Sequence, residues 1–189
     1  MTRHCEDLDP IIRRLWGPDL EAIQAHFLRL DPDTRQARFA GHLNDAAVAR
    51  YAQNILRLDS LVYGAFVGGR LRAVAELRGL FNGWPATAEA AFSVESNWQN
   101  RGIGEALFDH ILAVAQNRGV RTLYMICLRE NERMTHLARK HDAQLHHEPG
   151  AIEATLAPHW PTPMSLFDEA FRESRGFACA ILQWPDGRS

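Results

Sequence analysis

The stretch at residues 88–128 reads AEAAFSVESNWQNRGIGEALFDHILAVAQNRGVRTLYMICL, and its hydrophobic spacing changes twice. Along residues 88–95, the positions of Glu89, Ser93 and Glu95 alternate with those of the apolar Ala90, Phe92 and Val94, which predicts a strand. Apolar side chains then recur every three to four positions over residues 103–116, which predicts a helix with Gly119 just past its end. Residues 122–128 are almost wholly apolar, the pattern of a strand buried on both faces. The three segments therefore predict a βαβ unit with parallel strands.

The flanking sequence predicts a larger sheet around this unit. Two β-rich runs, residues 61–67 and 71–77, are separated by Gly68-Gly69-Arg70, which predicts an antiparallel hairpin. Asp31-Pro32-Asp33 is interpreted as the stop of a preceding helix. The remaining predicted elements are a strand at residues 10–16, helices at 20–30, from about 44 and at 132–141, a loop at 82–85, and two short strands within 143–156.

Composition limits the classes of protein to which the chain can belong. Its 189 residues are 46% hydrophobic, enough for one compact core but not for two independent domains. A net charge of −2 argues against a nucleic-acid partner. No segment has the apolar length of a membrane span, and the N-terminus has no secretory pattern. Three widely spaced cysteines suit reduced thiols, so we expect a cytoplasmic protein.

Four histidines between His136 and His147 match no standard zinc spacing, and no nearby cysteine completes a tetrahedral set. We therefore expect no metal.

The turn at residues 99–104, QNRGIG, is the candidate anion site. It joins the predicted strand to the predicted helix, and its glycines allow main-chain N–H groups to approach an anion at the positive helix end. A third glycine with a downstream acidic residue, the dinucleotide fingerprint, is missing, and so is the Gly-Lys-Ser/Thr of a P-loop. Pyrophosphate binding without nucleotide hydrolysis or hydride transfer is the remaining expectation.

Here the chain resembles the GNAT superfamily of N-acetyltransferases. The family's loop of Gln or Arg, two residues, Gly, one residue, then Gly or Ala is matched by Gln99, Gly102 and Gly104. The stretch 89–143 is closest in pattern to the acetyltransferase domain of bacterial protein-lysine acetyltransferases. The resemblance implies an α/β (α+β) GNAT fold, a mixed and mostly antiparallel sheet flanked by helices with a βαβ cofactor unit. It places this domain at residues 1–157, with 158–189 as a C-terminal extension packed on it.

The resemblance also implies acetyl-CoA as cofactor. Backbone groups around residues 92–94 would pair with the pantetheine arm, and amides of residues 101–105 would take the phosphates. Asn131, after the second strand, would contact the cofactor, cap the following helix, or do both. The implied cofactor-binding residues are Phe92, Ser93, Val94, Gln99, Asn100, Arg101, Gly102, Ile103, Gly104, Glu105 and Asn131.

Catalysis of this kind needs a neutral amine, whereas a lysine amine has a pKa of ~10.4 and requires a base. Glu89 matches the position of the family's catalytic glutamate, and Glu76 is the reserve candidate. A backbone N–H near Val94 would stabilise the negative charge that develops on the thioester oxygen. Ala138 stands where many members carry a tyrosine, so the general acid is unassigned. Asp142 replaces a usual glycine, which puts the local turn in doubt.

The expected activity is acetyl transfer from acetyl-CoA to a primary amine, by direct attack in a ternary complex, with a protein lysine as leading acceptor. A small-molecule amine is the alternative acceptor. A catalytically silent acyl-CoA sensor is the alternative from another class, because of Ala138. The apolar run at residues 177–184 follows a helix predicted at 164–175 and could form an edge strand, which would pair across a homodimer.

Overall fold

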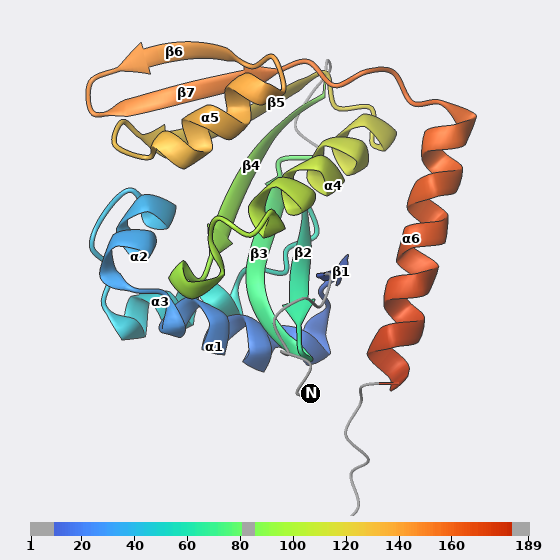
Figure 1. Cartoon of the computed structure of the whole chain (residues 1–189), viewed down its shortest axis with the longest axis horizontal. Coiled ribbons are helices and arrows are strands. Elements are labelled where there is room, and N and C mark those ends of the chain that lie inside the picture. Colours follow the sequence, from blue (N-terminus) through green and yellow to red (C-terminus); the bar gives the residue numbers. More distant parts are fainter. Residues whose placement is uncertain (1–9, 81–85, 183–189) are drawn as a thin grey trace, which may run out of the picture.

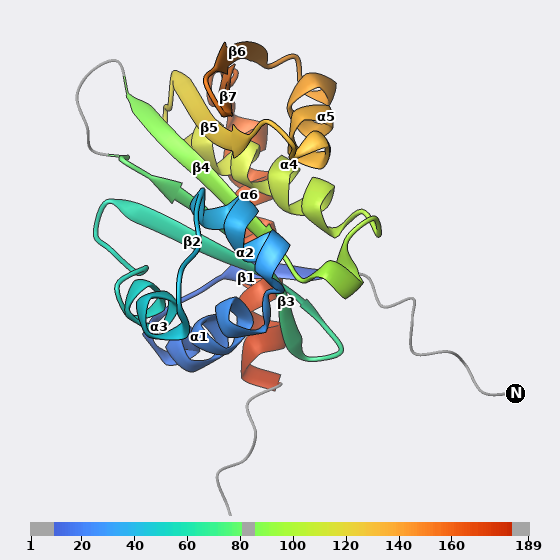
Figure 2. The same ribbon diagram turned by 90° about the vertical axis from the view of Figure 1, so that its left-hand side faces the viewer.

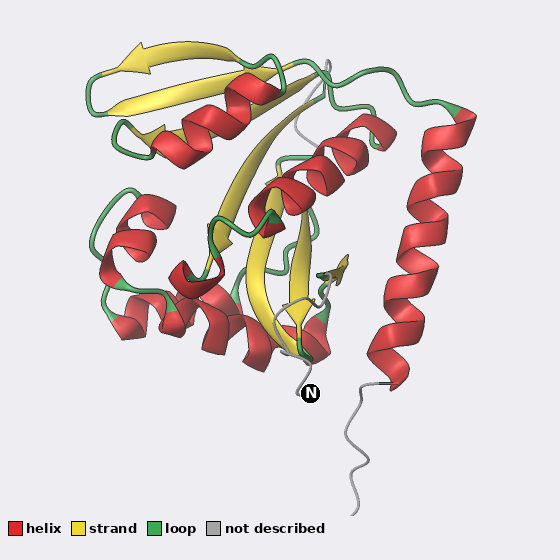
Figure 3. Ribbon diagram, in the orientation of Figure 1, coloured by secondary structure: helices red, strands yellow, loops and turns green. Residues whose placement is uncertain are grey.

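The computed structural model describes residues 10–80 and 86–182, so the loop expected at residues 82–85 lies outside the described residues. Seven strands form one mixed sheet in the order β1-β2-β3-β4-β5-β7-β6 (Figure 1; Figure 3). Neighbouring strands are antiparallel except β4 and β5, which are parallel. The strands are β1 (Ile11–Arg14), β2 (Ser60–Val67), β3 (Arg70–Arg78), β4 (Thr87–Val94), β5 (Thr122–Leu128), β6 (Gln144–Glu148) and β7 (Ala151–Leu156).

Helices cover both faces of the sheet. The helices are α1 (Leu20–Arg29), α2 (Pro32–Phe39), α3 (Asp45–Gln53), α4 (Ile103–Asn117), α5 (Glu132–Lys140) and α6 (Pro163–Leu182). Helices α1 to α3 lie on one face, and α4 and α5 on the other (Figure 2). The expected GNAT arrangement, a mostly antiparallel sheet with one parallel βαβ unit, is therefore confirmed.

Two hydrophobic clusters separated by the sheet hold these layers together. Along β2, side chains alternate between them because successive residues of a strand point to opposite faces. Tyr63 is fully buried against the α4 side, where Leu107 and Phe108 pack. Its neighbour Val62 lies in the other cluster with Phe27 of α1. Both faces of this half of the sheet are consequently core, which makes it a rigid base for β4.

The predicted hairpin and βαβ unit are confirmed. Gly68 and Gly69 join β2 to β3 with φ angles of +59° and +74°, a conformation that side chains with a Cβ rarely adopt. Gly119 follows α4 at φ +71°, and the N–H of Val120 donates to the carbonyl of Ala115 at 3.0 Å. This is the glycine-ended helix C-terminus that the sequence predicts.

One helix was missing from the sequence-based scheme. Asp31-Pro32-Asp33 does end α1, but it also starts α2, which was not predicted. The Asp31 carboxylate accepts from the N–H of Thr34 at 3.0 Å, and Pro32 occupies the first turn. Aspartate as N-cap followed by proline is a helix-start signal, and the interpretation as a simple stop overlooked it.

The prediction that β5 is covered on both faces was wrong. Burial alternates along the strand, with Leu123, Met125 and Cys127 buried, whereas Ile126 is 60% exposed. The apolar run is continuous, but α4 and α5 lie on only one side of it. The side of β5 that carries Ile126 therefore faces a groove, not a helix layer.

The predicted edge strand in the C-terminal extension was also wrong. Helix α6 continues through Gly176 to Leu182, and the rest of the apolar run lies outside the described residues. An uninterrupted apolar run fits a strand and a buried helix equally well, so periodicity alone could not distinguish them. Helix α6 packs against β1 and α4, where the amide of Asn117 donates to Glu169 at 2.6 Å.

Asp142 adopts the left-handed conformation at φ +58°, in the position where the resemblance expects glycine. The N–H of Ala143 donates to Ala138 at 3.0 Å, and the N–H of Asp142 donates to Arg139 at 3.1 Å, the pattern of a Schellman helix end. Replacing Asp142 with glycine is expected to raise the free energy of unfolding by up to about 1 kcal/mol, because the left-handed strain disappears. Urea denaturation measures this; a lower stability than wild type would contradict it.

Candidate active site

The first turn of α4 has free hydrogen-bond donors. Gly102 is its N-cap at φ +77°, no side chain in the described part of the chain caps it, and the first internal bond is Ala106 N–H to Gly102 carbonyl at 2.9 Å. An α-helix leaves its first N–H groups without internal partners, here those of residues 102–105. Asn100 precedes at φ +58°, so two left-handed residues shape the turn. This end of α4 is consequently an uncapped cluster of donors with a partial positive charge.

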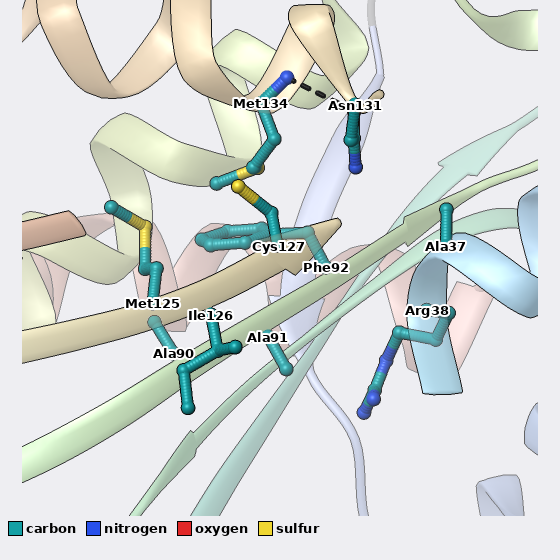
Figure 4. A pocket seen from close by; sticks show the side chains of 10 residues that line it. All are labelled: Ala37, Arg38, Ala90, Ala91, Phe92, Met125, Ile126, Cys127, Asn131 and Met134. Carbon is teal, nitrogen blue, oxygen red and sulfur yellow. Dashed lines mark hydrogen bonds between the residues drawn. The ribbon is translucent and has the colours of Figure 1, made fainter. Parts of the chain in front are cut away.

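A pocket opens where β4 and β5 diverge. Their parallel pairing ends at Glu89 opposite Tyr124. The pocket begins at the next residue on each strand, and α2 and the start of α5 close it on opposite sides (Figure 4). Its lining residues are Ala37, Arg38, Ala90, Ala91, Phe92, Met125, Ile126, Cys127, Asn131 and Met134.

The main chain of β4 faces this gap. The N–H of Glu95 donates to Arg72 of β3 at 3.0 Å, whereas the carbonyl of Val94 accepts from the Gln99 side chain on the other side. Backbone groups of a strand alternate in direction, so the N–H groups of Phe92 and Val94 point away from β3, toward the diverging β5. They can therefore pair with an extended ligand inserted between the strands.

Of the predicted cofactor residues, Phe92 and Asn131 line the pocket, and the others lie at the end of β4, on the turn that leads into α4 or in the first turn of that helix. Asn131 lines the pocket and also caps α5, accepting from the Met134 N–H at 3.2 Å. Ile103 is buried, so only its main chain reaches the turn. Glu105 is ion-paired with Lys140 of α5. The guanidinium of Arg101 lies over the ring of Trp98, 4.9 Å from its centre.

Glu89, the predicted base, is exposed at the point where the strands separate. Among the described residues it accepts no hydrogen bond, so its oxygens can take a proton. Its cross-strand partner is Arg78 of β3, which supplies a nearby positive charge. Glu89, which directly precedes the pocket residue Ala90, is thus a carboxylate whose oxygens no described residue occupies.

Glu76, the reserve candidate, is placed differently. It is fully buried, and its carboxylate is ion-paired with Arg38 and Arg78. The hydroxyl of Tyr51 donates to it at 2.7 Å, and burial together with the Glu76 charge raises the pKa of Tyr51. Three donors therefore occupy the Glu76 oxygens, which suits an anchor of α2 and α3 on the sheet better than a proton acceptor.

Ser93 is directed away from the gap. Its hydroxyl lies 2.9 Å from Nε2 of the buried His26, whose Nδ1 lies 3.4 Å from Glu95. Burial lowers the pKa of His26 against the opposing effect of Glu95, so the ring is neutral, with its proton on Nδ1 toward the carboxylate. Burial works against the ionised Glu95, but hydrogen bonds from His26, Arg72 and Arg29 lower its pKa to about 2. The cluster fixes the end of β4 to α1.

The free energy of unfolding is expected to fall in two stages with acid. Below the ordinary His26 pKa of 6.5, the unfolded chain binds a proton that the folded chain excludes. Between the ordinary Glu95 pKa of 4.5 and its folded value of about 2, the same holds for this carboxylate. Urea unfolding across the pH range measures both stages. His26→Gln should abolish the first stage only; the same pH dependence in this variant would contradict the assignment.

The turn and pocket fit a ligand with an anionic diphosphate and an extended amide-bearing arm. A Cβ built on Gly102 would have no atom within 4 Å, so the space next to the donors is open. Sequence reasoning missed the contribution of α2, which brings Ala37 and Arg38 to the pocket. Cys127 of β5 is buried and also lines the pocket.

Comparison with known proteins assigns the family. A sequence model described as the Acetyltransferase (GNAT) family matches residues 22–142. The chain belongs to the GNAT acetyltransferase family. A relative, Acetyltransferase PA5475 of Pseudomonas aeruginosa, is 30% identical over 132 residues, which cover 67% of this chain and 70% of the relative.

Solved GNAT structures share the fold. The crystal structure of the GNAT domain of S. lividans PAT superimposes with a TM-score of 0.68 at 22% identity, covering 83% of this chain and 99% of that one. The ribosomal-protein-S18-alanine N-acetyltransferase from Escherichia coli gives a TM-score of 0.62 at 19% identity, covering 82% and 97%.

As a GNAT protein, the chain is an N-acetyltransferase, and members of this family generally use acetyl-CoA. In the part of the chain that the structure describes, no helix is both long and apolar enough to cross a bilayer. Nor do three His, Cys, Asp or Glu side chains of the described residues gather as metal ligands would.

Proposed function

We propose that this GNAT protein transfers acetyl from acetyl-CoA to a primary amine of a protein lysine, by direct attack in a ternary complex. The uncapped N-terminus of α4 beside the β4–β5 pocket is the observation that carries the proposal. When bound, acetyl-CoA supplies the thioester whose acetyl group is transferred. The cytoplasmic location expected from the sequence stays a prediction. The possible homodimer also stays a prediction, although α6 replaces the edge strand from which it was inferred.

The chain's own groups would act in sequence along the pocket. Main-chain N–H groups of residues 101–105 hold the diphosphate, and the backbone of β4 pairs with the pantetheine arm. Of the two β4 N–H groups that point into the gap, that of Phe92 lies nearer Glu89 and would stabilise negative charge on the acetyl oxygen, whereas that of Val94 lies nearer the loop and would pair with the pantetheine. Toward the Phe92 end of the gap, Glu89 would remove the proton from the incoming ammonium group through water. Orientation of the two reactants in one pocket supplies the remaining acceleration.

The acceptor would enter from the side of α2. Ala37 and Arg38 form this wall, opposite Met134 of α5 and Asn131, the N-cap of α5 (Figure 4). The exposed side of β5 at Ile126 borders the same entrance, where no helix of the described residues covers it. An open entrance of this kind accommodates a lysine on a larger protein. The likeness to the GNAT domain of PAT supports the fold of such an entrance but not the acceptor.

Calorimetric titration with acetyl-CoA, followed by thiol release with a panel of acceptors, tests the proposal. Binding, with release of free thiol in the presence of lysine-containing proteins, supports it. Release only with small amines such as polyamines or amino acids would assign the alternative acceptor class. Binding without turnover for any amine would favour an acyl-CoA sensor, since Ala138 is buried and carries no hydroxyl. Absence of binding would overturn the proposed function.

A further inference from the structure

We propose that the side chain of Gln99 is a positioning residue that joins α2 to α5 across the pocket and thereby sets the fit of the amine acceptor. It would leave diphosphate binding to the main chain of the loop. This inference rests on the proposed function for its catalytic consequences, although the connection itself is a property of the fold.

The Gln99 amide makes three hydrogen bonds to three different elements. Its Nε2 donates to the Val94 carbonyl of β4 at 2.9 Å and to Thr34 Oγ1 of α2 at 3.2 Å. Its Oε1 accepts from Arg133 Nη1 of α5 at 2.7 Å. The partners fix the orientation of the amide, because a carbonyl can only accept and a guanidinium can only donate. The amide's two N–H groups and one oxygen lone pair are therefore already used within the protein.

The bond to Thr34 fixes the α2 wall of the pocket, which Ala37 and Arg38 form. Thr34 lies in the first turn of α2, and its own hydroxyl donates to the N-cap residue Asp31 at 2.7 Å. Ala37 and Arg38 follow three and four residues later, so they lie on the same side of the helix as Thr34. These are the two α2 residues that line the pocket. The position of Thr34 consequently sets the position of this wall.

The first half of helix α2 depends on such polar contacts. None of the eight residues of α2 is fully buried, and its aromatic packing lies at the far end, where Phe39 contacts Phe27 and Tyr51. Nearer the start, the contacts are polar and include the Gln99–Thr34 bond and the bond from Arg35 to the Leu28 carbonyl at 3.1 Å. Gln99 thereby connects the first turn of α2 to the cofactor loop.

The bond from Arg133 acts on the opposite wall. Arg133 lies in the first turn of α5, between the pocket residues Asn131 and Met134. The Arg133–Gln99–Thr34 chain therefore spans the pocket mouth from α5 to α2 and passes through the residue that opens the cofactor loop. Loss of the amide would free α2 to move away from β4 and widen the acceptor entrance, while leaving the first turn of α4 intact.

The decisive experiment compares two ligands in Gln99→Ala. Loss of the three hydrogen bonds predicts a roughly tenfold rise in KM for the probe acceptor Nα-acetyl-lysine amide. The Kd for acetyl-CoA, measured by calorimetry, should stay within about twofold of wild type, because the main chain of the loop is unchanged. Thr34→Val, which removes the Gln99–Thr34 bond and the Thr34–Asp31 bond but leaves the bond from Arg133, should also raise the acceptor KM. The two changes together should cost less than the product of their separate effects, since they break one shared bond.

A second measurement makes the inference independent of turnover. Amide hydrogen exchange should rise in α2 (residues 32–39) of Gln99→Ala and stay unchanged in β7 (residues 151–156). Gln99→Glu keeps an acceptor for Arg133 but loses both donors, so it should resemble Gln99→Ala in α2 exchange. A tenfold weaker acetyl-CoA affinity with an unchanged acceptor KM would identify Gln99 as a cofactor ligand and overturn the inference. Unchanged exchange in α2 would also overturn it. A wild-type protein that fails to bind acetyl-CoA would sink the proposed function, whereas the exchange data would still decide the role of Gln99.

Discussion

Valine at position 102 is expected to weaken acetyl-CoA binding by at least ~100-fold. Gly102 occupies φ +77°, a region that valine avoids, so the turn would have to rearrange and misdirect its N–H groups. The open space next to the glycine Cα would also be filled by the side chain where the diphosphate should lie. Isothermal titration calorimetry with acetyl-CoA measures the change.

Gly119→Val is the matched control for this prediction. Gly119 lies past the other end of α4, has φ +71°, and likewise has no atom within 4 Å of a built Cβ. Both variants should lose stability to a similar extent, on the order of 1–2 kcal/mol, since each forces a side chain into the left-handed region. Only Gly102→Val should lose binding. Equal affinities in the two variants would show that the α4 N-terminus does not hold the diphosphate.

Glu89→Gln is expected to lower kcat by a factor of about 10²–10⁴, the usual contribution of a general base. Glutamine preserves the shape of the side chain but cannot accept the ammonium proton at neutral pH. The Kd for acetyl-CoA should stay the same, because Glu89 lies outside the predicted cofactor loop at residues 99–104. It is located on β4, at the last residue pair between β4 and β5. Steady-state kinetics with a lysine acceptor and parallel calorimetry measure the two quantities.

The control is Glu148→Gln, which removes an exposed carboxylate on the outer strand β6 and should leave kcat unchanged. Unchanged turnover in Glu89→Gln would assign the base elsewhere. Glu76→Gln then becomes the informative variant, although it also disturbs the ion pairs with Arg38 and Arg78. The thermal unfolding of Glu76→Gln must therefore be measured beside its kinetics. The comparison distinguishes the loss of a catalytic base from the destabilisation of α2.

Most of the fold could be predicted from regular patterns of apolar residues and glycines in the sequence. The alternation in β4, the 3.6-residue period of α4 and the glycines at positions 68, 69 and 119 are local properties, and each predicted its element correctly. Local reasoning failed where one signal allowed two structures. Asp31-Pro32 both ends one helix and begins another, and the apolar run after residue 176 fits either period.

The candidate site likewise has one part that a local sequence signal predicts and one part that it does not. The loop at residues 99–104 carries its signal in consecutive residues, because glycine and a helix start are enough to predict free N–H groups. The pocket has no such signal in consecutive residues, since α2, β4, β5 and α5 each contribute to it. No spacing in the sequence indicates that Thr34 and Arg133 share the amide of Gln99, or that Ser93 is bonded to His26.

The sequence by itself determined the βαβ unit, its glycine-bounded turn and the family of the protein, because these depend on backbone preferences within short segments. Only the tertiary structure decided which carboxylate is free, Glu89, and which is occupied, Glu76, since burial and ion pairing arise between segments distant in the chain. The same holds for α2 as the wall of the acceptor entrance. Chemical roles of side chains depend on their neighbours in space, and the fold alone supplies those neighbours.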